Sequence, residues 1–332
     1  MIKFKYDVFE NKSDGIYQIR SKSDIITIQF TQEEEKVIFL SIVDILKNKN
    51  ISDFQQLISE LIDGNNNKDN VINVIDKLKK FNVFQNQDTF ENLEQFKFID
   101  KYSSFSNDFA KKIATSEIVI IGRGLLVELL ETKAKKTGYK NVIKILLEES
   151  YNIDEIFKAC KSSDLIIVDS DSWDPIFLEN FNKFALDNKK PWIIVRGNES
   201  TRGTVGPIFI PGITGCYNCL ITRVKSTMSY LSHFEEYENF LRLNKTSSAI
   251  DGGLAVSYDI LASIAILESV KYLTDFSIPS IFKAFLSINI NDYQIKSNPF
   301  LKIPHCPVCN PKMDFNPAPW LETATLKNTK DE

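Results

Sequence analysis

The chain has 332 residues, 43% of them hydrophobic and 25% charged, and it carries a net charge of -4 at neutral pH. This length allows two domains, and the composition is typical of a soluble globular protein. The acidic balance excludes nucleic acid or an anionic membrane as the main partner, because no basic excess exists to neutralise phosphates. Since no apolar run is long enough to span a bilayer and the first residues are not a signal peptide, we expect a cytoplasmic protein.

The first 88 residues are the first predicted domain, a small α+β unit. Three strands are predicted from apolar alternation or clustering: Ile2–Val8, Ile16–Arg20 and Asp24–Phe30. Three helices are expected to follow, the first opening with a capping box formed by Thr31 and Glu34. The other two are expected over Asp53–Ile62 and Asp69–Lys80. This content indicates a winged-helix-like unit, which is either a packing appendage or a peptide-docking module with a free strand edge.

A polar connector over residues 89–115 is expected next, followed by the main domain over residues 116–315 and a flexible tail over 316–332. The main domain alternates strands with helices. Its strands are predicted over Glu117–Ile121, Val142–Leu147, Asp164–Asp169 and Trp192–Arg196. Its helices are predicted over Leu125–Lys136, Pro175–Leu186 and Ala255–Leu273. This alternation predicts an α/β fold with a Rossmann-type parallel sheet that is covered by helices.

Cysteine spacing gives the most specific signal in the sequence. Cys216 and Cys219 form one CxxC pair, and Cys306 and Cys309 form a second. Two such pairs place four thiolates for tetrahedral Zn²⁺, and four protein ligands leave no open position for a substrate. We therefore predict a structural zinc site that joins the middle of the chain to its far end. The fifth cysteine, Cys160, lies in an amphipathic stretch and is predicted to be a buried small hydrophobe.

A glycine loop follows the first strand of the main domain. Gly122 and Gly124 match two of the three glycines of a nucleotide-binding loop, whereas Val127 occupies the third position. The next strand ends in Glu148-Glu149, where an acidic residue could hold a ribose. Only two histidines are present, which excludes a His-based triad or a His-rich catalytic metal site. The loop is therefore a degenerate nucleotide motif, and no residue is assigned a catalytic role.

The zinc motifs also carry a family resemblance. The stretch from Gly206 to Leu220, GPIFIPGITGCYNCL, followed by Arg223 and by the closing PHCPVC, resembles the zinc-bearing half of the ThiF/MoeB fold. More narrowly, it is similar to the divergent ThiF-like proteins of thiazole/oxazole-modified peptide biosynthesis, the ocin-ThiF or SagC-like group. The N-terminal domain resembles the RiPP recognition element that these proteins carry.

This resemblance implies a partner of a YcaO cyclodehydratase that holds the leader of a ribosomal precursor peptide. The YcaO subunit then uses ATP to convert core Cys, Ser or Thr residues to azolines in a bacteriocin or thiopeptide pathway. A flavin-dependent dehydrogenase is implied as a further partner, and homodimerisation is usual for the fold. The chain itself is expected to be a largely non-catalytic scaffold.

Departures from the active members of the family support this expectation. Active members have a GxGGLG-like loop and an arginine that reaches the triphosphate, whereas Leu125 and Leu126 occupy this loop and no arginine follows the second strand. Their metal-binding aspartate follows the third strand, where Asp169 and Asp171 are the candidates. Without this charge stabilisation we expect no use of ATP. The alternatives kept open are an active adenylating enzyme and a dinucleotide-dependent oxidoreductase.

A leader peptide is expected to add as a strand to the edge of Asp24–Phe30, with the helix Asp69–Lys80 flanking it. The sequence does not decide which face of this strand meets the core. On the helix, Val71, Ile75 and Leu78 are predicted to face the strands. The predicted peptide-binding residues are Ile25, Ile26, Thr27, Ile28, Gln29, Phe30, Asn70, Asn73, Val74 and Lys77.

Overall fold

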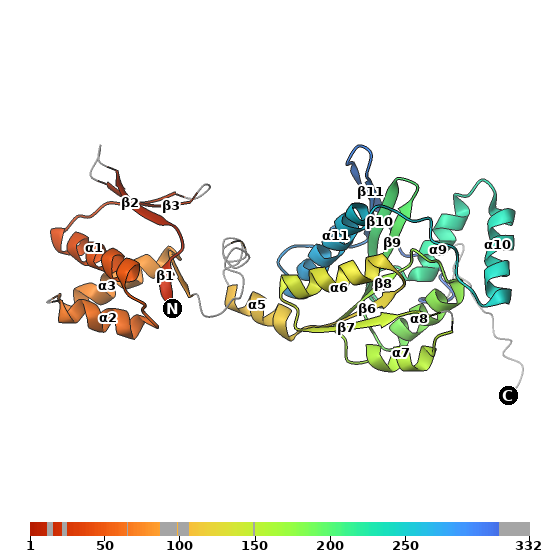
Figure 1. The fold of residues 1–332 in the computed structure, drawn as a ribbon, viewed down its shortest axis with the longest axis horizontal. Helices are drawn as coiled ribbons and strands as arrows, with labels where there is room; N and C mark the ends of the chain where they lie inside the picture. The colour runs from red at the N-terminus through yellow and green to blue at the C-terminus, as the bar shows by residue number, and fades with distance from the viewer. Residues whose placement is uncertain are drawn as a thin grey trace, which may run out of the picture. The chain divides into compact units, whose positions relative to one another are not determined.

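The computed structural model of the protein divides into two compact units, Met1–Ala110 and Lys111–Glu332, drawn in Figure 1. The predicted tail lies outside the described residues, as does most of the predicted connector. The described residues are 1–11, 16–21, 25–64, 66–86, 98, 106–148 and 150–311.

The described part of the N-terminal unit forms two small antiparallel sheets. Strands β2 (Asp7–Asn11), β3 (Ile16–Arg20) and β4 (Ile25–Ile28) form a three-stranded sheet in that order. Strand β1 (Ile2–Phe4) pairs instead with β5 (Phe84–Asn86). The prediction of one strand over Ile2–Val8 is therefore wrong. The chain leaves the first small sheet at Lys5, whose N–H donates to Val83 O at 2.9 Å, before it enters the second.

Three helices follow the three-stranded sheet: α1 (Glu33–Asn48), α2 (Phe54–Asp63) and α3 (Lys68–Lys80). The predicted capping box is wrong, because Gln32 occupies the N-cap and makes no side-chain cap bond. Three glutamates in the first turn of α1 instead complement the positive end of the helix dipole. Helix α2 begins where predicted, since the Asp53 carboxylate accepts a hydrogen bond from Gln56 N at 2.8 Å. The Asn67 side chain caps α3 in the same way.

The second unit is built on a seven-stranded sheet with the order β12-β11-β10-β9-β8-β6-β7. Its strands are β6 (Glu117–Gly122), β7 (Asn141–Leu146), β8 (Leu165–Asp169), β9 (Trp192–Glu199), β10 (Arg202–Phe209), β11 (Ala284–Asn289) and β12 (Ile295–Pro299). Strands β7, β6, β8 and β9 are parallel, as predicted. The other three pair antiparallel, so the sheet is mixed. The sequence did not predict these three strands. Strand β10 is antiparallel because it returns through a tight turn after β9, a connection that only antiparallel neighbours allow.

Helices cover both faces of this sheet, as Figure 1 shows. Helices α6 and α11 pack together over one face, whereas α7, α8 and α9 belong to the other side, where the second unit has a large aromatic core. The helices are α5 (Ser106–Thr115), α6 (Leu125–Thr137), α7 (Ile153–Cys160), α8 (Pro175–Asp187), α9 (Tyr217–Ser226), α10 (Leu231–Asn244) and α11 (Ala255–Thr274). Among the described residues, no helix combines the length and hydropathy that a bilayer span requires.

A buried carboxylate ties α8, α9 and α10 together. Glu238 on α10 is 5% exposed and pairs with Lys225 on α9 and with Arg242 one turn further on. Arg242 also donates to Glu179 on α8, with Nη1 at 2.8 Å from a carboxylate oxygen. Burial tends to raise the pKa of Glu238, but its hydrogen bonds to Lys225 and Arg242 outweigh this and hold the pKa below its ordinary value.

Candidate functional site

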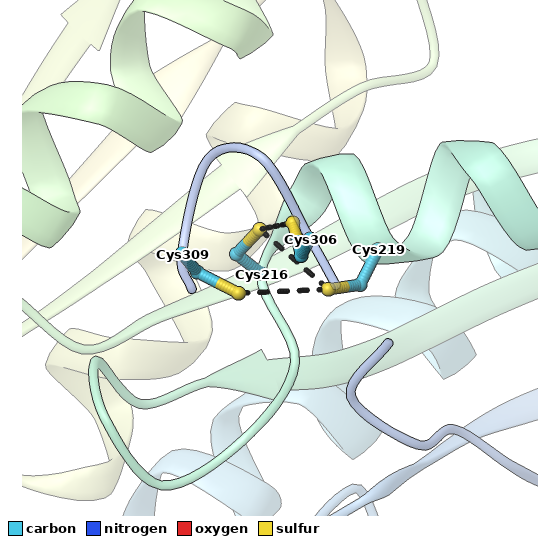
Figure 2. A group of neighbouring side chains, drawn as sticks. All are labelled: Cys216, Cys219, Cys306 and Cys309. Atoms are coloured by element: carbon cyan, nitrogen blue, oxygen red, sulfur yellow. Dashed lines mark hydrogen bonds between the residues drawn. The ribbon is translucent and has the colours of Figure 1, made fainter. Parts of the chain in front are cut away.

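The four predicted cysteine ligands meet in one cluster. Cys216 is the N-cap of α9 and Cys219 lies in its first turn, while Cys306 and Cys309 lie in the turn that follows β12. Figure 2 shows the two pairs pointing toward one another, one from the start of α9 and one from the C-terminal loop. Three of the side chains are buried, and all four Sγ atoms lie within 4.8 Å of one another. The structure thus joins two segments that are 90 residues apart in the chain.

The distances within the cluster fit a tetrahedral metal ion. The Sγ of Cys216 lies 3.9 Å from that of Cys219 and 3.7 Å from that of Cys306, and the Sγ of Cys219 lies 3.6 Å from that of Cys309. A tetrahedron with metal–sulfur bonds of about 2.3 Å has sulfur–sulfur edges of about 3.8 Å. Backbone and amide N–H groups also approach the sulfurs: Ile303 N donates to Cys219 and Asn218 Nδ2 donates to Cys306, each at 3.5 Å. Such contacts orient thiolate ligands.

Cys160 belongs to a different environment. Its side chain is fully buried in the aromatic core, where burial raises the pKa of the thiol to about 12. A thiol in this state is inert, because the thiolate is the reactive and metal-binding form. This confirms the prediction that Cys160 is a packing residue.

The glycine loop lies where β6 ends against β8. A Cβ on Gly122 would come within 2.4 Å of the Asp169 Cβ, so the last residue of β8 approaches the backbone of the loop. The Asp169 carboxylate accepts hydrogen bonds from Arg123 N at 3.3 Å and from Asp171 N at 2.9 Å. Burial raises the pKa of Asp169 to about 7. Val127, at the third glycine position, is fully buried beneath the loop.

Asp171 faces helix α11. Tyr258 on α11 donates its hydroxyl to the Asp171 carboxylate at 2.7 Å, and burial raises the pKa of Asp171. This carboxylate lies directly over Gly197 of β9, where a Cβ would approach it to 2.3 Å. The two candidate aspartates therefore occupy separate environments, Asp169 under the loop and Asp171 beside α11.

The Arg123 side chain spans the carboxyl ends of three strands. Its Nε donates to Leu147 O at 2.9 Å and its Nη2 to Glu148 O at 3.1 Å, both just after β7. Its Nη1 donates to Ser172 Oγ at 3.2 Å, after β8, and also to Ser247 Oγ. Sequence reasoning missed this role, because the glycine-loop pattern assigns no function to the residue between the glycines.

A segment that we call the strap, residues 246–254, contacts the residues that follow β6 and β8. Ser248 N donates a hydrogen bond to Trp173 O at 2.8 Å. Its hydroxyl accepts from Trp173 N at 2.8 Å. Ile250 lies against the loop, since its Cδ1 would be 3.8 Å from a Cβ on Gly124. The strap thus lies over both the loop and the end of β8.

The N-terminal unit presents β4 as an edge strand. In the described part of that unit β4 pairs only with β3, so its other side is free. The structure also decides the faces, which the sequence left open. Ile26, Ile28 and Phe30 pack on the core, whereas the other predicted residues of this segment, Ile25, Thr27 and Gln29, are exposed.

The four predicted peptide-binding residues of α3 have different surroundings. Val74 is 4% exposed and lies in the core, so its assignment to a groove or to solvent is wrong. The reason is that α3 packs on both α1 and α2 and buries a wider face than one stripe. Asn73 is exposed, while Asn70 donates to Glu34 at 3.0 Å and Lys77 to Glu35 at 2.6 Å. Both partners lie in the first turn of α1.

Comparisons with known proteins identify the fold. No protein-family model and no curated protein sequence matches the chain. A solved structure of a heterocyclase in complex with substrate and cofactor matches with a TM-score of 0.68 and 16% identity, over 93% of this chain and 39% of that one. The heterocyclase TruD matches with a TM-score of 0.66 and 18% identity, over 93% and 42%. E. coli MccB with ATP matches with a TM-score of 0.53 and 15% identity, over 93% and 99%.

These matches extend across both units and show a shared ThiF/MoeB-like fold, since the identities are too low to show more. The chain spans about two-fifths of the length of the heterocyclases that it matches, whereas it matches MccB over nearly the full MccB chain. The neighbours are thus heterocyclases and a microcin C7 biosynthetic enzyme.

Proposed function

We propose that this chain is a leader-binding, largely non-catalytic scaffold subunit that presents a ribosomal precursor peptide to a YcaO cyclodehydratase. In this proposal the N-terminal unit is a RiPP recognition element, and the second unit is a ThiF-like domain that has lost adenylation. The products are azolines or azoles in a bacteriocin or thiopeptide, and a flavin-dependent dehydrogenase carries out any later oxidation. The expected assembly is a homodimer.

The free edge of β4 is the observation that carries the proposal. An edge strand presents unpaired backbone N–H and C=O groups, and an extended peptide can pair with them while its alternate side chains enter pockets. The exposed side chains of Ile25 and Thr27 lie on one face of β4, and the half-buried Ile26 and Ile28 lie on the other. A leader strand added beside β4 would therefore meet apolar surface on both faces. Helix α3, through Asn70, Asn73 and Lys77, is the proposed flank of this site.

The second support for the proposal is that the glycine loop lacks the groups that adenylation requires. Adenylation requires a cradle for the triphosphate and positive charge on it. The third glycine is replaced by the buried Val127, and the segment between β7 and α7 contains no arginine. ATP-dependent activation of the peptide is therefore assigned to the partner.

The chain matches about two-fifths of the length of the heterocyclases that share this fold. In this proposal a YcaO protein supplies the heterocyclisation chemistry. The four-cysteine cluster is assigned to Zn²⁺ with a structural role, because four sulfur ligands saturate a tetrahedral ion.

Reconstitution tests this function. The purified chain, the precursor peptide encoded beside its gene and the neighbouring YcaO protein are mixed with ATP, and the product is examined by mass spectrometry. We expect the loss of one water per heterocycle only when all components are present. Equal heterocycle formation without this chain contradicts the proposal.

A second function, adenylation of a peptide C-terminus, is favoured by the match to nearly the whole chain of MccB, a protein solved with ATP. The two functions differ in one measurement, ATP–pyrophosphate exchange by the isolated chain with the precursor peptide. The scaffold proposal predicts no exchange above a protein-free control. Peptide-dependent exchange establishes the second function instead.

A further inference from the structure

Arg123 occupies a position where a ligand of an α/β sheet is expected. Ligands of open α/β sheets bind in the crevice at the carboxyl ends of the parallel strands, where the strand order reverses. In this sheet the order reverses at β6, whose neighbours β7 and β8 both follow it in sequence. The Arg123 side chain lies across these three strand ends, with bonds to Leu147 O, Glu148 O and Ser172 Oγ.

Four of the five N–H groups of the Arg123 guanidinium donate hydrogen bonds to groups of the protein itself. Arginine has five N–H donors in a rigid fork, and a phosphate-binding arginine directs two parallel donors at an anion. Here Nε and Nη2 donate to the two backbone carbonyl groups that follow β7, and Nη1 donates to the hydroxyl groups of Ser172 and Ser247. Only one N–H is left, and a fork committed to four neutral acceptors cannot clamp a phosphate.

The strap is hydrogen-bonded to Arg123 and to Ser172. Ser247 is bonded both to Arg123 and to Ser172 Oγ, the latter at 2.7 Å, and Ser172 Oγ donates to Ser248 O at 3.0 Å. The arginine therefore links the glycine loop, the ends of β7 and β8, and the strap in one polar network. Replacing Arg123 by a small residue removes the group that joins these four segments.

We propose that Arg123 is a built-in occupant of this crevice and excludes an adenine nucleotide from it. This inference rests on the proposed function, in which the second unit has lost adenylation, and it names the residue that keeps the crevice closed. What remains without the side chain is a glycine loop at the N-terminus of α6 and the carboxylate of Asp169, which can hold a nucleotide with its magnesium ion. Adenylation is still not expected in such a variant, because the third glycine and the triphosphate arginine stay absent.

The test measures the binding of a fluorescent ATP analogue, with Mg²⁺, to the full chain. The expected result is a dissociation constant at least about tenfold lower for Arg123→Ala than for wild type, which corresponds to about 1.4 kcal/mol. Arg242→Ala is the control, because it removes an arginine that is bonded to two carboxylates outside the crevice, and it should leave the affinity unchanged. Far-ultraviolet circular dichroism and bound-metal content identify folded variants.

Arg123→Lys keeps the proposal testable if the alanine variant does not fold. Lysine retains the charge, but its single ammonium cannot bridge the carbonyl and hydroxyl groups together, so we expect an intermediate gain in affinity. A folded Arg123→Ala or Arg123→Lys protein without any gain overturns the inference. Nucleotide binding by wild type that is weakened by either variant also overturns it. Leader-peptide binding at β4 is measured separately in the same variants. A loss of leader binding counts against the proposed function, whereas an unchanged nucleotide affinity counts against the inference about Arg123.

Discussion

Gly122 and Asp169 lie in such close contact that no Cβ fits between them. A Cβ on Gly122 would approach the Asp169 Cβ to 2.4 Å and the Val127 Cγ2 to 2.9 Å. Gly122→Ala should therefore force β6 and β8 apart at their carboxyl ends and lower the free energy of unfolding by about 1–3 kcal/mol. Urea denaturation measures this loss.

Gly64→Ala is the control for this substitution. Gly64 follows α2 with a negative φ, and its nearest atom to a new Cβ is at 3.4 Å. We expect a change of at most about 0.5 kcal/mol, as for other substitutions away from special features. Equal effects of the two alanines would contradict the claimed contact between Gly122 and Asp169.

The cysteine cluster predicts one zinc ion per chain. Cys219→Ser removes a fully buried ligand whose Sγ lies within 4 Å of two other sulfurs, so the variant should lose zinc and melt at a lower temperature. Elemental analysis and thermal denaturation measure both effects. Cys160→Ser, at a buried cysteine outside the cluster, should keep the full zinc content. A zinc-free wild-type protein contradicts the assignment.

The network around Glu238 predicts a pH-dependent stability. Glu238→Gln should lower the free energy of unfolding at pH 7 by about 1–3 kcal/mol, because the hydrogen bonds to Lys225 and Arg242 lose their charge. Since the folded-state pKa of Glu238 lies below the ordinary value of 4.5, its contribution is present above pH 4.5 and is lost as the pH falls through the folded pKa. The difference between variant and wild type should therefore shrink in acid.

Urea denaturation at several pH values follows this difference. Glu179→Gln is the control, because Glu179 is at the exposed end of the same network and should contribute less than about 1 kcal/mol. A pH-independent effect of Glu238→Gln would show that packing, and not charge, accounts for its contribution.

The edge of β4 predicts an asymmetric response to matched substitutions in the N-terminal unit. Ile25 on β4 is 54% exposed and Phe9 on β2, at the opposite edge of the sheet, is 42% exposed. Ile25→Ser should weaken leader binding about tenfold, equivalent to about 1.4 kcal/mol, because a leader strand loses an apolar neighbour. Phe9→Ser should leave binding unchanged. Fluorescence anisotropy of a labelled leader measures both, and equal losses would place the site elsewhere.

Local sequence signals predicted the parts of the structure that depend on local chemistry. The CxxC spacing of Cys216 and Cys219 is itself the geometry of a metal knuckle, and the helix predicted to start at Asp53 is capped by that residue. Three of the four parallel strands, β6, β8 and β9, follow from apolar runs that are largely buried on both faces, whereas the edge strand β7 is only partly buried.

The features that sequence reasoning missed depend on distant partners. Arg123 bonds to groups between 24 and 124 residues further along the chain, and no pattern around Gly122 reports them. Val74 is buried because two helices, α1 and α2, pack on α3. From the sequence of α3 alone, only Val71, Ile75 and Leu78 were expected to lie in the core. The antiparallel strands β10 and β11 are joined across a long connection, and β10 to β12 carry weak alternation.

Hydrogen exchange of the full-length, zinc-loaded protein with the leader of the precursor encoded beside its gene tests the central claim most directly. The account predicts saturable binding that slows exchange of backbone amides in β4, Ile25–Ile28, while amides of β2 on the opposite edge of the sheet stay unchanged. Thr27→Pro, which removes one backbone donor from β4, should abolish this protection. A folded protein that ignores the leader, or binds it without protecting β4, contradicts the account.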